Sequence, residues 1–147
     1  MVPIRVLHVD DDAPFLELTA AFLTAASDRF SVVSEPTPAA GLDRLAADPV
    51  DCVVSDYRMP SSTGIAFLEA VRAEYPALPF ILFTGEESAA VANDALAAGA
   101  TDVLRKRPGT DQFDRLAARI RTAVERHRAQ QARRRYQRLL ETVDEPT

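Results

Sequence analysis

Short apolar runs alternate along this chain with amphipathic stretches of helix length, and this alternation most constrains the fold. Strands are expected at 4–9, 30–34, 51–55, 80–83 and 102–105. The run at 80–83, FILF, is apolar at every position, as expected for a strand covered on both faces. Five such units predict an α/β domain with a doubly wound parallel sheet, right-handed crossovers and helices on both faces.

Helix starts are marked by capping residues. Asp12 followed by Pro14 predicts one helix start, and Thr37 followed by Pro38 predicts another. The 3–4 spacing of apolar residues predicts that the first helix faces the sheet with Phe15, Leu18, Phe22 and Ala26.

Composition restricts the class of protein. The 147 residues suffice for one domain with a short appendage, and 47% hydrophobic with 27% charged residues is a globular balance. The single cysteine, Cys52, excludes an internal disulfide and a cysteine-rich zinc site. The sequence has no apolar run of about 18 residues and no signal-peptide pattern at its start, which predicts a cytoplasmic protein.

Charge is unevenly distributed within a net charge of −5. Residues 1–120 hold 18 acidic and 10 basic residues, whereas residues 121–147 hold seven arginines and four acidic residues. An acidic body repels phosphate backbones, which argues against non-specific nucleic-acid binding. Of the 17 cationic side chains, 16 are arginine, and the single lysine is Lys106.

Reactive side chains follow four of the five expected strands. Asp10 and Asp11 follow the first, Asp56 the third, Thr84 the fourth, and Lys106 the fifth. Open sheets of this type bind ligands at the carboxyl ends of their strands, so these residues are expected in one crevice.

Their chemistry is that of an aspartyl-phosphate site. Converging carboxylates repel one another unless a hard cation such as Mg²⁺ compensates them. A threonine hydroxyl and a lysine ammonium can both bind a phosphoryl group, and an aspartate can act as its nucleophile. Each residue alone has an ordinary alternative: Asp12 as a helix cap, Asp10 or Asp11 as a solvated acid, Thr84 as a turn cap, Lys106 as a surface cation. Their joint occurrence at strand ends favours the shared site.

Four ordered segments, VLHVDDDAPF, VVSDYRMPSSTG, ILFTGEES and GATDVLRKRP, resemble the signature segments of response-regulator receiver domains. The resemblance covers roughly residues 3–125. It implies the flavodoxin-like strand order 2-1-3-4-5 and a phosphoprotein of a two-component phosphorelay.

The resemblance also implies residue roles. Asp56 corresponds to the aspartate that accepts a phosphoryl group from the phosphohistidine of a histidine kinase or phosphotransfer protein. Thr84 and Lys106 correspond to the hydroxyl and the ammonium that contact this group. The implied Mg²⁺ ligands are Asp11, Asp56, Asp10 through water, and the backbone carbonyl of Arg58.

Two positions depart from the family pattern. Val103 stands where such domains usually carry an aromatic residue, so a rotating-ring signal is not expected. Lys106 is followed by Arg107 instead of proline, so a cis peptide is not expected there. The resemblance also implies that Gly85, the small residue after the hydroxyl, leaves room for the phosphoryl group, and that Arg58 and Glu86 flank the site where they tune access of the hydrolytic water.

We expect a receiver domain at 1–125 and a helical extension or linker at 126–147. A last helix is expected to start near Asp111 and to continue as a solvated helix, although Arg133–Arg135 leave a weak nucleic-acid contact open. The segment YQRLLETVDEPT resembles the opening helix of a PAS sensor domain. This resemblance implies the N-terminal receiver of a longer PAS or histidine-kinase-type signalling protein.

The predicted function is a phosphoacceptor receiver domain that switches contacts with an output domain or protein. It is expected to have no enzymatic activity beyond self-phosphorylation and autodephosphorylation, and a homodimer is left open. Two alternatives remain. One is a Mg²⁺-dependent phosphohydrolase, for which Asp10 and Asp12 have the spacing of a nucleophile and a second acid. The other is a receiver-like scaffold that is not phosphorylated.

Overall fold

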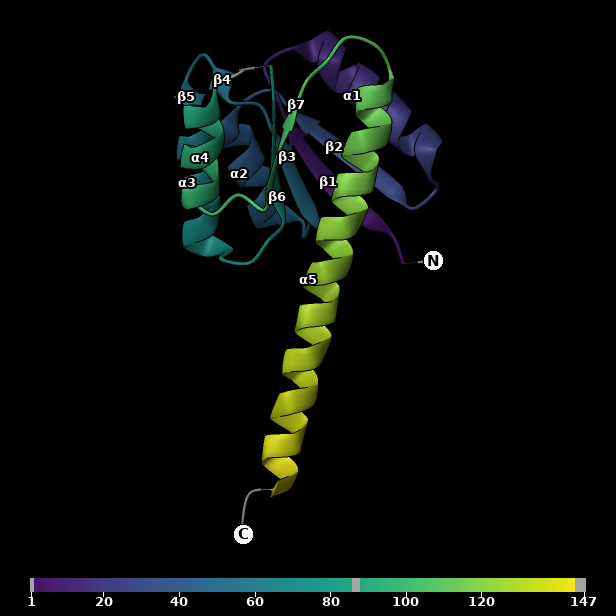
Figure 1. Cartoon of the computed structure of the whole chain (residues 1–147), viewed down its shortest axis with the longest axis vertical. Coiled ribbons are helices and arrows are strands. Elements are labelled where there is room, and N and C mark those ends of the chain that lie inside the picture. The colour runs from purple at the N-terminus through teal and green to yellow at the C-terminus, as the bar shows by residue number, and fades with distance from the viewer. Residues whose placement is uncertain (1, 86–87, 145–147) are drawn as a thin grey trace.

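A five-stranded parallel sheet forms the centre of the computed structural model, which describes residues 2–85 and 88–144 (Figure 1). Its order is β2-β1-β3-β6-β7, which confirms the predicted flavodoxin-like topology. The strands are β1 (Ile4–Val9), β2 (Phe30–Glu35), β3 (Cys52–Ser55), β6 (Phe80–Thr84) and β7 (Asp102–Arg105).

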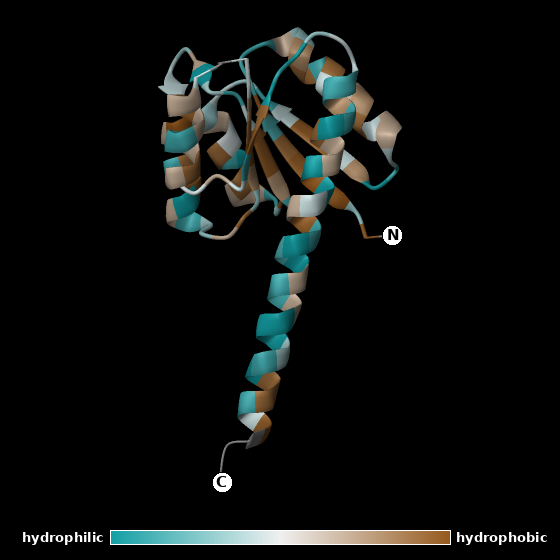
Figure 2. Ribbon diagram, in the orientation of Figure 1, coloured by the Kyte–Doolittle hydropathy of each residue, from teal (hydrophilic) through white to brown (hydrophobic). Residues whose placement is uncertain are grey.

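Helices cover both faces of the sheet (Figure 1). On one face lie α1 (Ala13–Ala26) and α5 (Asp111–Asp144). On the other lie α2 (Pro38–Ala47), α3 (Gly64–Glu74) and α4 (Ala89–Ala97). Each face has its own apolar core because side chains alternate between the two sides of a strand. Figure 2 shows the hydrophobic strands enclosed between these two layers.

Strand β6, which lies between β3 and β7, is buried along its whole length, in agreement with its uninterrupted apolar sequence. Phe80 and Leu82 contribute to the core under α2, α3 and α4, and Ile81 and Phe83 to the core under α1 and α5. The first half of α5 faces the sheet with Leu116, Ile120 and Val124, which are at most 1% exposed.

The predicted helix caps are also confirmed. The Asp12 side chain accepts a hydrogen bond from the Phe15 backbone N–H at 3.1 Å. Thr37 accepts one from the Ala40 N–H at 3.1 Å. Each satisfies a backbone donor that the first helical turn leaves unpaired.

The predicted apolar face of α1 is partly wrong. Leu18 is 46% exposed and Ala26 is also exposed, while Phe15 and Phe22 are half-buried. The buried positions are Leu16, Thr19 and Leu23. Thr19 can be buried because its hydroxyl donates to the Phe15 carbonyl at 2.8 Å.

The segment after Asp56 forms a small antiparallel ladder between β4 (Arg58–Met59) and β5 (Ser62–Thr63). Gly64 ends this segment, and its N–H donates to the Tyr57 carbonyl at 2.6 Å. A Cβ at Gly64 would overlap the backbone carbonyl of Asp56, so the close approach of α3 to the end of β3 requires glycine.

Helix α5 continues without a break to Asp144 and projects from the edge of the sheet opposite to its start (Figure 1). The boundary expected between residues 125 and 126 therefore falls inside one helix, and residues 145–147 lie outside the described residues. Within the described ranges, no helix combines the length and apolarity needed to cross a membrane.

Candidate functional site

The carboxyl ends of β1 and β3 bring three aspartates together. Asp10, Asp11 and Asp56 each offer an oxygen, and these oxygens lie within 4.8 Å of one another. Asp10 is fully buried, Asp56 is 9% exposed, and Asp11 is exposed. The main-chain N–H of Asp56 donates to the Val9 carbonyl at 3.0 Å, which fixes the two strand ends in register.

The fifth strand delivers Lys106 to the same place. Its backbone N–H donates to the Thr84 carbonyl at 2.8 Å, so the pairing of β6 with β7 extends to the lysine. Its Nζ lies 2.8 Å from Oδ2 of Asp10 and 3.5 Å from Oδ1 of Asp56. One ammonium thus contacts two carboxylates of a three-carboxylate cluster.

Burial raises the pKa of Asp56 above its ordinary value. The positive charge of Lys106 opposes this shift, and the negative charge of Asp10 adds to it. Hydrogen bonds from the Tyr57 N–H, at 2.9 Å, and from the Thr84 hydroxyl favour the ionised form of Asp56. The pKa nevertheless stays raised, so negative charge at Asp56 is incompletely compensated by the protein's own groups.

The structure also decides most of the single-residue alternatives. Asp12 caps α1 as that alternative predicted, and its N–H donates to Asp10 at 3.0 Å. Asp10 is not a solvated acid, since it is buried and bonded to Lys106. Thr84 ends β6, and the following helix is capped by Ser88. Lys106 is bound within the crevice, with 21% of its side chain exposed.

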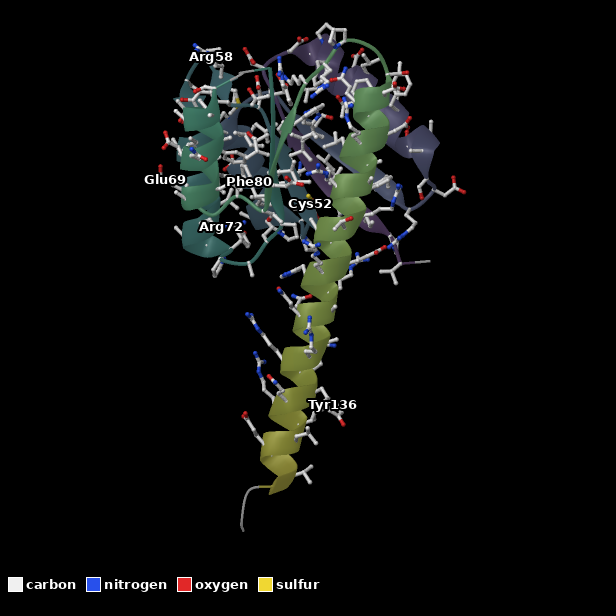
Figure 3. All side chains as sticks on the ribbon, viewed as in Figure 1. Cys52, Arg58, Glu69, Arg72, Phe80 and Tyr136 are labelled. Atoms are coloured by element: carbon white, nitrogen blue, oxygen red, sulfur yellow. The ribbon has the colours of Figure 1, made fainter. Side chains whose placement is uncertain are left out.

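Arg58, on strand β4, lies near the aspartate cluster. It lines a cavity of about 350 Å³ together with Asp11, Tyr57 and residues 59, 60 and 63. Figure 3 shows the Arg58 side chain at the sheet edge from which β7 leads into α5. The cavity therefore opens beside an exposed carboxylate and the segment whose carbonyl is predicted to bind a metal.

The loop after Lys106 is braced by Gln112, a residue that the sequence did not indicate. The side chain of Gln112 accepts from the Arg107 N–H at 3.0 Å and donates to the Gly109 carbonyl at 2.8 Å. Gln112 is 6% exposed, and Gly109 has a positive φ of 89°. As expected from Arg107, no cis peptide occurs among the described residues.

Two aromatic rings beside the lysine were also missed. The Lys106 Nζ lies 4.4 Å from the centroid of the Phe15 ring. His8 contacts the same ring edge-on at 6.1 Å, and neither of its nitrogens has a partner among the described residues. Burial lowers the pKa of His8 to about 3, so this imidazole is neutral. The spacing of Phe15 indicated only a core residue of a helix. The one sequence feature that pointed here was His8, a polar residue within an apolar strand.

Of the remaining predicted positions, Val103 and Gly85 lie among the described residues. Val103 is half-buried and lines a cavity of about 240 Å³ with Thr84, Ser88 and residues 89, 92, 104 and 105. A Cβ at Gly85 would meet no described atom within 4 Å, which agrees with the room predicted there. Glu86 lies outside the described residues.

Comparison with known proteins identifies the family. Residues 6–121 match the model of the response regulator receiver domain. The chain is 36% identical over 120 residues to the transcriptional regulatory protein FixJ of Bradyrhizobium diazoefficiens, covering 82% of this chain and 56% of that protein. It is 36% identical over 126 residues to a protein-glutamate methylesterase/protein-glutamine glutaminase of Nocardioides sp., covering 84% of this chain and 34% of that protein.

A solved receiver domain has the same architecture. The crystal structure of a response regulator receiver domain protein from Clostridium thermocellum superposes with a TM-score of 0.76 at 26% identity, covering 86% of this chain and 98% of that one. The chain spans little more than half of the FixJ relative and a third of the methylesterase. The chain belongs to the receiver domains of two-component response regulators.

Proposed function

We propose that Asp56 is the phosphoacceptor of this receiver domain. The observation that carries the proposal is the position of its carboxylate at the rim of the acidic cluster. There it lies 3.5 Å from the Lys106 ammonium and accepts a hydrogen bond from Thr84. It is the least buried of the carboxylates that contact the lysine, which makes it the accessible nucleophile.

The donor set fits Mg²⁺. Asp10, Asp11 and Asp56 offer only oxygen ligands, and the pKa of Asp56 is raised despite the nearby lysine. Mg²⁺ prefers one or two carboxylates, retained waters and phosphate oxygens. Asp11 and Asp56 would hold the ion directly, with Asp10 acting through water and the Arg58 carbonyl adding a ligand. When bound, the ion neutralises negative charge on the carboxylates and on an incoming phosphoryl group.

The transfer uses the residues around Asp56. An Asp56 carboxylate oxygen forms a bond to phosphorus as the bond between phosphorus and the donor's imidazole nitrogen breaks, and that nitrogen keeps the electron pair and takes up a proton. Lys106 stabilises charge on the equatorial oxygens. Asp10 holds the lysine in place, since their 2.8 Å contact is the shorter of its two ion pairs.

Thr84 links the phosphorylated site to the rest of the domain. Its hydroxyl now bonds the Asp56 carboxylate, and a phosphoryl oxygen would offer it a more highly charged acceptor. The hydroxyl lies at the end of β6 beside the Val103 cavity, so its movement would alter the surface formed by α4 and β7. We therefore assign signal output to this surface, without a rotating aromatic ring.

The partners of this reaction are a histidine kinase or phosphotransfer protein as donor and an output domain or protein as receiver of the signal. The chain itself is proposed to catalyse only its own phosphorylation and dephosphorylation. The phosphohydrolase alternative loses its second acid, because Asp12 caps α1 with its side chain and donates its N–H to Asp10.

The test is stoichiometric labelling by a small phosphodonor. Incubation of the full chain with acetyl phosphate and Mg²⁺ should add one phosphoryl group per molecule, measured by intact mass, and peptide mapping should place it on Asp56. Asp56→Asn should remain unlabelled, whereas Asp43→Asn, an exposed carboxylate on α2, should label normally. Full labelling of Asp56→Asn would overturn the assignment.

Two further measurements separate the alternatives. Multiple turnover of p-nitrophenyl phosphate would indicate the phosphohydrolase. Failure of the native chain to bind either Mg²⁺ or beryllofluoride would indicate the unphosphorylated scaffold. The phosphoacceptor requires both to bind, with labelling that stops at one equivalent.

A further inference from the structure

The ammonium of Lys106 contacts three groups that come from three different elements. Two are the carboxylates of Asp10 and Asp56, at 2.8 and 3.5 Å. The third is the Phe15 ring, whose centroid lies 4.4 Å from Nζ. An aromatic face carries negative electrostatic potential and attracts a cation at this separation. Phe15 belongs to the first turn of α1 and not to the acidic cluster.

The Phe15 ring is held from several sides. Phe83 of β6 and Phe113 of α5 lie against it at centroid distances of 5.7 and 5.8 Å. His8 of β1 contacts it edge-on at 6.1 Å with an interplanar angle of 69°. Phe113 is itself stacked on Phe22 at 4.9 Å. Rings supplied by two strands and by α5 therefore fix the aromatic face over which the lysine lies.

Lys106 needs such a support because its own loop does little to restrain its side chain. A lysine side chain has four rotatable carbon–carbon bonds and a compact charge without directional preference. Two hydrogen bonds fix the backbone here: the Lys106 N–H donates to the Thr84 carbonyl, and the Arg107 N–H donates to the Gln112 side chain. Among the described residues, the lysine Nζ is instead contacted by the two carboxylates and the ring.

We propose that Phe15 is a positioning residue for Lys106: the fixed ring face holds the ammonium over the Asp56 carboxylate, where it meets the incoming phosphoryl group. This inference rests on the proposed phosphoacceptor function. It assigns the four-ring cluster of His8, Phe15, Phe83 and Phe113 a part in the site beyond packing. Loss of the cation–aromatic contact is expected to slow phosphoryl transfer by about 2-fold to 30-fold.

The decisive experiment changes the ring's charge distribution and keeps its shape. Site-specific incorporation of 4-fluoro-, 3,5-difluoro- and 3,4,5-trifluorophenylalanine at position 15 progressively weakens the negative potential of the ring face. The rate of labelling by acetyl phosphate at saturating Mg²⁺ should fall stepwise along the series, with the unfolding midpoint in urea unchanged or slightly raised. A rate that stays constant along the series would overturn the proposal.

Two controls test whether the effect depends on the contact between Phe15 and Lys106. The same series at Phe67, a buried α3 ring that contacts Phe80 on the other face of the sheet, should leave the rate unchanged. In a Lys106→Met background, the series at Phe15 should also have no effect on the residual rate. A fluorine dependence that persists without the lysine would show that Phe15 acts by another route, and would reject the positioning role.

A second readout is independent of phosphorylation. Because Lys106 is the single lysine of the chain, ¹³C-labelled lysine gives one side-chain NMR signal set. The ring current of Phe15 should shift the Lys106 Hε protons upfield, and Phe15→Leu should return them towards their random-coil position. Random-coil shifts in the native protein would overturn the inference even if Asp56 is phosphorylated. An upfield shift without phosphorylation would instead reject only the proposed function.

Discussion

Charged residues are concentrated in two regions of the molecule. One is the edge of the sheet where the strands end and the site lies, and the other is the projecting half of α5, residues 126–144. Their charges have different surroundings. At the site edge, the carboxylates of Asp10 and Asp56 are enclosed and share one ammonium. In the projecting half, Arg133, Arg134 and Arg135 are exposed to solvent. Exclusion of water strengthens the interactions of the first set, whereas water and salt screen the second.

Apolar side chains differ in the same way between the two halves of α5. Leu116, Ile120 and Val124 pack against the sheet, whereas Tyr136, Leu139, Leu140 and Val143 are 46–79% exposed. Figure 3 shows Tyr136 on the projecting part of the helix, away from the body. At 3.6 residues per turn, the second stripe lies about 150° around the helix from the first. The helix therefore turns its later apolar residues away from the face that the sheet covers.

The largest expected effect comes from this contrast in burial. Ile120→Ala should lower the free energy of unfolding by about 2–5 kcal/mol, because it leaves a cavity against the strands. Leu139→Ala, on the same helix and already 61% exposed, should change it by less than about 0.5 kcal/mol. Urea unfolding of the full chain measures both. A comparable loss in Leu139→Ala would show that the projecting stripe is covered in solution.

A second prediction compares charges and depends on pH. The raised pKa of Asp56 means that its carboxyl ionises more readily in the unfolded chain than in the folded one. Its ionisation therefore lowers stability as pH rises from the unfolded pKa through the higher folded pKa, and the penalty is complete above the latter. In EDTA at pH 7, Asp56→Asn should be more stable than the native chain, and the difference should shrink as the pH falls towards about 4.

The projecting half supplies the control for that prediction. Glu141→Gln removes an exposed carboxylate of α5 and should leave the unfolding midpoint unchanged across the same pH range. Added Mg²⁺ should stabilise the native chain and Glu141→Gln but not Asp56→Asn, because a ligand that binds the folded state raises its stability. A pH-independent difference between Asp56→Asn and the native chain would contradict the raised pKa.

Much of the fold and the main residues of the site could be predicted because both follow from local sequence patterns. Apolar runs of strand length, capped helix starts and polar residues at strand ends are local features, and parallel topology gathers those ends at one edge. Asp10, Asp56, Thr84 and Lys106 meet for this reason. The strand bounds differ from those expected by one residue at most.

The contacts that were not predicted join residues that are distant in sequence or differ in chemical type. Phe15 matched an apolar helix face, and nothing local showed that a cation from residue 106 would lie over its ring. Gln112 braces a loop from the first turn of the next helix. Leu18 fitted the same spacing as Phe15 but is exposed, because the buried face of α1 is formed by Leu16, Thr19 and Leu23. The spacing of apolar residues identifies a face of a helix but not the residues that this face contacts.

The smallest effect is expected from removing the projecting half altogether. Chains ending at residue 125 and at residue 129 should both be labelled by acetyl phosphate at the native rate, because the site residues lie at the opposite edge of the sheet. The longer chain retains residues 126–129, among them Arg128, which donates to the Pro3 carbonyl at 2.6 Å and lies 3.3 Å from the Asp51 carboxylate. These contacts are partly exposed, so the shorter chain should lose at most about 1 kcal/mol of unfolding free energy relative to the longer. A large fall in labelling rate in both chains would show that the extension takes part in the chemistry, and would reject a receiver unit at residues 1–125.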